Sequence, residues 1–217
     1  MTVSVLLADD QALVRAGFRS LLARAKDIAV VGEAASGTEA VDLAARLAPD
    51  VVLMDIRMPG IDGIEATRRI RAARPTTRIV ILTTFDTDDH LFEALAAGAS
   101  GFLTKEIEPA ELRRAVAVAA AGEALLSPGV TQRVIARFAG KPSRPAASLA
   151  ALTTRENEVV RLVARGLSND EIARTLLISP LTAKTHVTRA ITKLAVRDRV
   201  HLVILAYEHG LVAPGEG

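Results

Sequence analysis

The chain has 217 residues, of which half are hydrophobic and only 3% are aromatic, and its formal net charge is +2. It contains no cysteine, which excludes disulfides and thiolate metal sites and fits a reducing compartment. No run of 18 apolar residues is free of charge, and the amino terminus, MTVSVLLADD, has no basic region before its first acids. The composition therefore predicts a cytoplasmic globular protein of one large or two modest domains, with no membrane partner.

The first part of the chain alternates short apolar runs with amphipathic stretches. The apolar runs cover residues 3–8, 28–31, 51–54, 79–82 and 101–103, and the amphipathic stretches cover residues 12–24, 38–47, 64–74, 89–97 and 109–121. Near-continuous short apolar runs are typical of strands that are buried on both faces. Five such βα units predict an α/β domain over residues 1–124, with a doubly wound five-stranded parallel sheet.

A connector and an all-helical region follow. The predicted linker, residues 125–148, includes a short helix over 130–138 and the sequence GKPSRPAAS, whose prolines and small residues favour an exposed segment. Beyond it lie four helical patterns and no strand pattern, over residues 154–165, 169–176, 181–194 and 199–209. The second predicted domain, residues 149–217, is therefore small and all-α.

Polar side chains follow four of the five predicted strands. Asp9 and Asp10 follow the first strand, Asp55 the third, Thr83 the fourth and Lys105 the fifth. Because the carboxyl ends of parallel strands meet at one edge of a sheet, we expect these side chains to converge. Three carboxylates favour a hard divalent cation, Mg²⁺ or Mn²⁺, and a carboxylate beside such an ion can attack a phosphoryl group. The hydroxyl and the ammonium could then stabilise the phosphoryl oxygens.

Four motifs in this region, LLADDQALVRAG, VVLMDIRMPGIDGIEATRRI, IVILTTFD and AAGASGFLTKE, closely resemble the receiver domain of bacterial two-component response regulators. The resemblance implies a flavodoxin-like receiver fold and a phosphoryl group accepted on Asp55 from a sensor histidine kinase. It also implies that Asp10 binds the metal directly, that Asp9 binds it through water, and that Asp55 and the backbone carbonyl of Arg57 complete the protein ligands.

The same resemblance implies how phosphorylation is transmitted. Lys105 would contact the phosphoryl group, and Thr83 would move inward to donate its hydroxyl to it. Phe102, three residues before the lysine, stands where relatives often have a tyrosine. The space vacated by Thr83 would let Phe102 rotate inward, which makes a two-state element biased by a local charge.

The second domain contains a helix-turn-helix pattern in SNDEIARTLLISPLTAKTHVTRAITKL. On a helical wheel of residues 181–194, one side is apolar and holds Ala183, Val187, Ala190, Ile191 and Leu194, whereas the opposite face is donor-rich and free of carboxylates. Such a face can enter the major groove of DNA, although a solvated surface helix is the plainer alternative. The candidate DNA contacts are Lys184, Thr185, His186, Thr188, Arg189 and Lys193.

The segments LTTRENEVVRLVARGLSNDEIA, KTHV and KLAVRDR closely resemble the LuxR-type helix-turn-helix, so the whole chain resembles a transcriptional regulator of the NarL/FixJ family. The resemblance implies binding to promoter DNA, a homodimer when phosphorylated, and no enzymatic activity beyond the protein's own phosphoryl transfer and dephosphorylation. Relatives often dimerise through the last helix, whose apolar stripe is equally consistent with the domain core: Val200, Val203, Ile204 and Tyr207.

Three other functions fit parts of the sequence. A phosphatase of the haloacid-dehalogenase type needs a second aspartate two residues after its nucleophile, where this chain has Arg57. An autoinducer-sensing LuxR activator shares the second domain but has no use for the acids of the first. A regulator that acts through protein contacts alone would keep both folds and bind no DNA.

Overall fold

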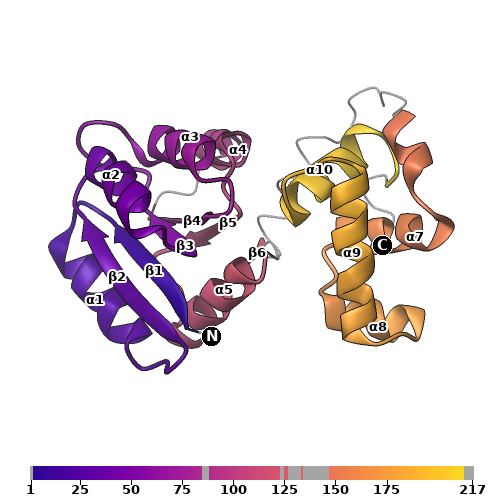
Figure 1. Ribbon diagram of the computed structural model, residues 1–217, viewed down its shortest axis with the longest axis horizontal. Coiled ribbons are helices and arrows are strands. Elements are labelled where there is room, and N and C mark those ends of the chain that lie inside the picture. The colour runs from indigo at the N-terminus through magenta and orange to yellow at the C-terminus, as the bar shows by residue number, and fades with distance from the viewer. Residues whose placement is uncertain (1, 85–87, 123–124, 127–132, 134–146, 213–217) are drawn as a thin grey trace. The chain divides into compact units, whose positions relative to one another are not determined.

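The computed structural model of the protein describes residues 2–84, 88–122, 125–126, 133 and 147–212 (Figure 1). The chain divides into two compact units, Met1–Leu126 and Ser127–Gly217. The helix predicted over residues 130–138 lies outside the described residues except for Arg133, and so does most of the predicted connector. Among the described residues, no helix is long and apolar enough to cross a membrane.

The first unit contains a parallel sheet, which confirms the predicted doubly wound α/β fold. Its strand order is β2-β1-β3-β4-β5-β6, and all neighbouring strands are parallel. The first five are the predicted strands, and β6 is a two-residue addition beside β5 that falls within the predicted linker. The strands are β1 (Val3–Ala8), β2 (Ile28–Ala34), β3 (Val51–Met54), β4 (Arg78–Thr83), β5 (Gly101–Thr104) and β6 (Leu125–Leu126).

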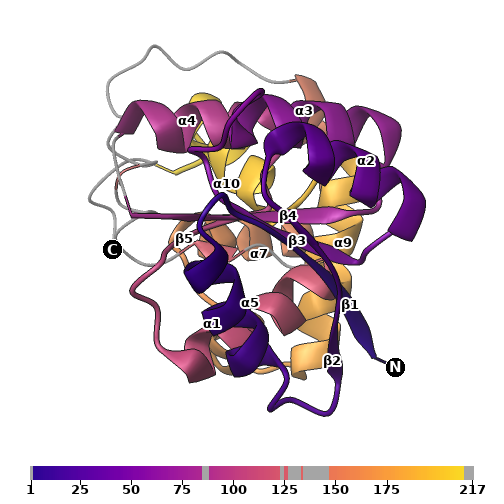
Figure 2. The same cartoon turned by 90° about the vertical axis from the view of Figure 1, so that its left-hand side faces the viewer.

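Among the described residues of this unit, five helices cover the two faces of the sheet, each within two residues of its predicted bounds. They are α1 (Ala12–Leu22), α2 (Gly37–Leu47), α3 (Gly63–Ala73), α4 (Asp88–Ala97) and α5 (Pro109–Ala120). Figure 2 shows α2, α3 and α4 on one face and α1 and α5 on the other, as their contacts also indicate. Because β3 lies between these layers, all four of its residues are buried, which explains the apolar run in the sequence.

The second unit is helical throughout its described residues. A short 3₁₀ turn, η1 (Ala147–Ala151), precedes α7 (Thr154–Ala164), α8 (Asn169–Leu176), α9 (Pro180–Lys193) and α10 (Arg199–Glu208). Each α-helix begins at a polar side chain that accepts a hydrogen bond from the backbone N–H three residues later. These caps are Thr153, Ser168, Ser179 and Asp198. Helix α7 packs against α9 and α10, and α8 packs against α9.

Candidate functional site

The acid cluster lies where the neighbouring strands β1 and β3 end. Ala8 of β1 is in register with Met54 of β3, so the next residues, Asp9 and Asp55, stand side by side at the carboxyl edge. The backbone N–H of Asp55 donates to the carbonyl of Ala8 at 2.8 Å, which fixes this arrangement. Since β1 has β2 on one side and β3 on the other, the cluster sits at the switch point of the sheet, where such folds bind ligands.

Three carboxylates come together at this edge. One oxygen from each of Asp9, Asp10 and Asp55 lies within 4.8 Å of the others. Asp9 and Asp55 are both only 4% exposed, whereas Asp10 faces solvent. Asp10 does not cap α1, because the residue at the cap position is Gln11 and it makes no side-chain capping bond. Asp9 does stabilise the turn, because its Oδ1 accepts a hydrogen bond from the backbone N–H of Gln11 at 2.9 Å, and its other oxygen still faces the cluster.

Lys105 joins the two buried acids. Its Nζ lies 2.6 Å from Oδ2 of Asp9 and 2.8 Å from Oδ2 of Asp55. Its backbone N–H donates to the carbonyl of Thr83 at 3.0 Å, which holds the ends of β4 and β5 together. Burial by itself would lower the pKa of Lys105, but hydrogen bonds and charges from Asp55 and Asp9 outweigh it and raise that pKa. The lysine therefore stays protonated and cationic inside the site.

Asp55 has the electrostatics of a buried carboxylate. Desolvation raises its pKa above the ordinary value, and this effect exceeds the lowering by the Lys105 hydrogen bond. Its Oδ1 accepts a hydrogen bond from the N–H of Ile56 at 2.8 Å, so both oxygens are held in place. A carboxylate that is oriented, poorly solvated and beside a cation is suited to react with a phosphoryl group.

The remaining predicted residues are Thr83, Arg57 and Phe102. Thr83 is 1% exposed at the end of β4, and Arg57 is exposed in the loop that follows Asp55. Phe102 is also 1% exposed and sits opposite Ile81 of β4. Phe102 is therefore a buried residue of the sheet in this conformation.

Two residues that hold the backbone of the acid cluster in place were not predicted from the sequence. Arg15 of α1 donates from Nη1 to the backbone carbonyl of Asp9 at 2.6 Å and from Nε to Glu33 at 3.3 Å, which ties α1, β1 and β2 together. Gly63 at the start of α3 lies against the backbone of Asp55, where a Cβ would come within 1.9 Å of the carbonyl oxygen. The motif letters contain both residues, but only the folded geometry shows what they touch.

The donor set fits a hard divalent cation. Carboxylate oxygens are the ligands that Mg²⁺ and Mn²⁺ favour, and Mg²⁺ sites commonly use one or two carboxylates with waters and phosphate oxygens. The solvent-facing Asp10 leaves one side of the cluster open, while Asp9 and Asp55 approach it from inside the fold.

Helix α9 presents the predicted polar face to solvent. Thr185, Thr188 and Arg189 are exposed, and Lys184 and His186 are partly exposed. The predicted inner side is buried at Ala183, Val187, Ala190 and Leu194, and Ile191 is half-buried. Within the described residues, Nδ1 of His186 is buried without a hydrogen-bond partner, so that nitrogen faces the protein.

Lys193, the last of the predicted DNA contacts, binds inside the unit. Its Nζ donates to Oε2 of Glu156 on α7 at 2.6 Å. That hydrogen bond, together with one from the backbone N–H of Thr153, lowers the pKa of Glu156 to about 2. Glu156 also completes the capping box of α7, so the ion pair fastens the end of α9 to the start of α7.

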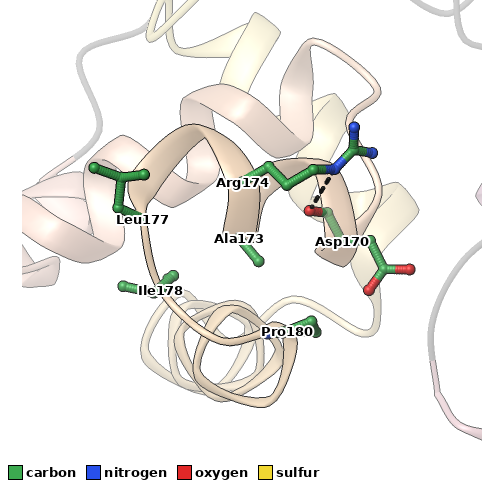
Figure 3. A pocket seen from close by; sticks show the side chains of 6 residues that line it. All are labelled: Asp170, Ala173, Arg174, Leu177, Ile178 and Pro180. Atoms are coloured by element: carbon green, nitrogen blue, oxygen red, sulfur yellow. Dashed lines mark hydrogen bonds between the residues drawn. The ribbon is translucent and has the colours of Figure 1, made fainter.

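The turn between α8 and α9 forms a shallow hollow in the surface. Figure 3 shows its six lining residues, among them Leu177 and Ile178 of the turn and Pro180, the first residue of α9. Leu177 ends α8 in the left-handed conformation, with φ of 53°, and its side chain is 92% exposed. The hollow borders the amino-terminal end of α9 and not its outward face.

The apolar stripe of α10 belongs mainly to the core of this unit. Val200, Val203 and Tyr207 are all less than a tenth exposed, and the Tyr207 hydroxyl donates to the carbonyl of Ala164 at 3.2 Å. Of the four predicted dimer residues, Ile204 alone is partly exposed. Of the two interpretations that the sequence left open, burial favours the domain core.

Comparisons with known proteins agree with both units. The model of the response regulator receiver domain matches residues 5–117, and the model of bacterial regulatory proteins, luxR family, matches residues 150–206. The chain is 44% identical over 212 residues to YxjL of Bacillus subtilis strain 168, an uncharacterized transcriptional regulatory protein, covering 97% of each chain. It is 39% identical over 212 residues to the response regulator protein VraR of Staphylococcus aureus, covering 98% of this chain and 100% of VraR.

A solved structure extends the likeness to three dimensions. The crystal structure of the response regulator ChrA, from a heme-sensing two-component system, shares 37% identity and a TM-score of 0.53 with this chain, covering 97% of this chain and 99% of ChrA. These relatives are regulators, and neither family model is that of a phosphatase. The chain therefore belongs to the two-component response regulators that join a receiver domain to a LuxR-type DNA-binding domain and act in transcription.

Proposed function

We propose that Asp55 is the phosphoacceptor and that its phosphorylation by a sensor histidine kinase controls dimerisation and promoter binding. The observation that carries the proposal is the geometry of Lys105, whose Nζ bridges the buried carboxylates of Asp9 and Asp55 at 2.6 and 2.8 Å. A cation held there can pair with the phosphoryl oxygens as soon as they arrive.

The proposed reaction transfers one phosphoryl group. An oxygen of Asp55 forms a bond to phosphorus while the bond from phosphorus to the kinase histidine breaks, and the electron pair of that bond stays on the imidazole, which takes up a proton. Lys105 would pair with the oxygens of the transferred group, and Thr83 would donate its hydroxyl to one of them. Reaction of the acyl phosphate with water would later return Asp55, so the protein's only chemistry is on itself.

Asp10, Asp9, Asp55 and the carbonyl of Arg57 would hold Mg²⁺ or Mn²⁺. The ion, when bound, neutralises charge on the phosphoryl oxygens. The three carboxylates have ligand oxygens within 4.8 Å of one another, so they support the metal site more directly than the carbonyl of Arg57 does. Phe102, which is buried, would form the apolar side of the switch.

The phosphorylation proposal is tested by intact-protein mass after incubation with acetyl phosphate and Mg²⁺. We expect the full chain to gain one phosphoryl group and the Asp55→Asn variant to gain none. Asp42→Asn, which removes an exposed carboxylate on α2, is the matched control and should be phosphorylated like the wild type. Phosphorylation of Asp55→Asn at the wild-type rate would exclude Asp55 as the acceptor.

The output is tested by gel shifts with genomic fragments, with and without acetyl phosphate. We expect the phosphorylated chain to dimerise and to retard a subset of fragments by binding them through α9. For Asp55→Asn, we expect acetyl phosphate to increase neither dimerisation nor DNA binding. Retardation of no fragment in either state would favour a regulator that acts through protein contacts. Dimerisation that is unchanged by phosphorylation would refute the proposed switch.

A further inference from the structure

Three of the exposed threonines of α9 do not point their hydroxyl hydrogens at solvent. The hydroxyls of these three donate to the backbone carbonyl four residues earlier: Thr185 to Leu181 at 2.9 Å, Thr188 to Lys184 at 3.0 Å, and Thr192 to Thr188 at 3.0 Å. With its hydrogen occupied in this way, a threonine offers a methyl group and an acceptor lone pair to a ligand. The face is therefore less donor-rich than its sequence indicates.

A leucine continues this face at the start of the helix. Leu181 is 74% exposed, so its side chain is available to a partner. At 100° per residue, Leu181 and the three threonines fall within an arc of about 60°. The buried side chains of Ala183, Val187 and Ala190 lie on the opposite side of α9. The outward face is thus a continuous stripe of methyl groups.

In the major groove, the apolar group that a base pair offers is the 5-methyl of thymine. We propose that the stripe formed by Leu181, Thr185 and Thr188 reads thymine methyl groups and sets the sequence preference of this regulator. The inference rests on the proposed binding of DNA by α9, and it names the base that the helix selects. Residues at the amino-terminal part of a recognition helix are the ones that reach base edges, which puts Leu181 in a reading position.

The residues around the stripe favour DNA over an apolar protein partner. Lys184 lies beside the stripe on one side and Arg189 on the other, about 60° and 80° from Leu181 on the wheel. No residue of α9 is acidic, and no acid occupies its first turn. A narrow methyl stripe between two cations matches a thymine-bearing groove between two phosphate backbones.

The test uses the full chain, phosphorylated with acetyl phosphate, and sequences that it selects from a random pool of double-stranded DNA. Each thymine of the selected site is replaced in turn by deoxyuridine, which lacks only the 5-methyl. Dissociation constants are then measured by fluorescence anisotropy. At one or more thymines, removal of the methyl should weaken binding by the wild type about fourfold, as expected for one methyl-sized group returned to water.

Two variants identify the side chain that contacts each thymine methyl group. Leu181→Ala should bind thymine and deoxyuridine sites equally at one position, and Thr185→Ser, which keeps the hydroxyl and loses the methyl, should do so at a neighbouring position. Leu177→Ala is the matched control, because Leu177 is even more exposed but lies on the turn and outside the stripe (Figure 3). It should keep the full methyl effect. Because all three side chains are exposed, none of the replacements disturbs the core.

The outcomes separate this inference from the function on which it rests. If the chain enriches no sequence from the pool, DNA binding itself is refuted. If it enriches a site but deoxyuridine binds as well as thymine at every position, the methyl stripe is overturned and DNA binding stands. The inference is also overturned if Leu181→Ala and Thr185→Ser both keep the wild-type methyl effect.

Discussion

Gly63 offers the sharpest test of how the fold positions Asp55. An alanine there would place Cβ 1.9 Å from the carbonyl oxygen of Asp55 and 2.8 Å from its carbonyl carbon. Real Cβ contacts stay above 3.0 Å, so the loop and the start of α3 must separate by about 1 Å. Both contact atoms belong to the backbone, which cannot swing away as a side chain can. The backbone bond from the N–H of Gly63 to the carbonyl of Ile56, 2.8 Å long, would be strained by the same movement.

We therefore expect Gly63→Ala to act on both stability and reaction rate. Overpacking of this kind lowers the free energy of unfolding by about 1–3 kcal/mol. A displacement of about 1 Å at a reacting group can slow a reaction by about 100-fold, so acetyl phosphate should phosphorylate the variant far more slowly. Urea unfolding gives the first quantity, and the mass of the intact protein against time gives the second.

Gly17→Ala is the control for this experiment. Gly17 lies inside α1 with no atom within 4 Å of the added Cβ, so alanine should leave the rate unchanged and stabilise the helix by up to about 1 kcal/mol. Wild-type stability and rate in Gly63→Ala would show that the Asp55 loop yields easily, and the close approach would then have no role in positioning the acceptor.

Three further predictions concern charge. Lys105→Met leaves two buried carboxylates within 4.8 Å of each other, which repel by about 3.5 kcal/mol at an effective dielectric of 20. In the presence of a chelator, the urea midpoint of this variant should therefore be lower than that of the wild type. Added Mg²⁺ should raise the midpoint of the variant more than it raises the midpoint of the wild type. Lys184→Ala should reduce the slope of log affinity for DNA against log salt by about 0.9 if it contacts one phosphate, and an unchanged slope would exclude that contact. The pKa of Glu156 is lowered to about 2 in the fold, so its ion pair stabilises the second unit fully above pH 4.5 and less as the pH falls toward 2. Glu156→Gln should remove this part of the pH dependence of the unfolding free energy. The control Glu158→Gln, on the same helix, should keep it.

The sequence predicted the fold well because its signals are local. The apolar run of β3 is buried on both faces, and the capping residues Ser168 and Ser179 begin α8 and α9 within a residue of the predicted starts. The two-residue strand β6 was missed, since so short a segment carries no periodicity and is a strand only because β5 lies beside it.

Convergence of the site was also predictable, because parallel strands bring their carboxyl ends to one edge. That rule placed Asp9, Asp55 and Lys105 together, and in the fold the Lys105 ammonium lies within 2.8 Å of a carboxylate oxygen of each aspartate. The rule says nothing of partners that come from the helices. The bond from Arg15 to the carbonyl of Asp9 and the ion pair of Lys193 with Glu156 depend on how helices pack, which no spacing in the sequence encodes.

The threonines of α9 show a further limit of sequence reasoning. Their exposure could be predicted from the helical wheel, but the hydrogen bonds of their hydroxyl groups could not. A hydroxyl on a helix competes for the second lone pair of the carbonyl four residues earlier. To donate its hydroxyl hydrogen to a base, Thr185 must first break its hydrogen bond to the carbonyl of Leu181. The bond that is lost and the bond that is gained each contribute a net free energy of about 0.5–1.5 kcal/mol. The exchange is nearly neutral, whereas burying a methyl group against thymine contributes about 0.8 kcal/mol without breaking anything. A recognition helix rich in threonine can therefore discriminate through its methyl groups even though its sequence suggests hydrogen bonding.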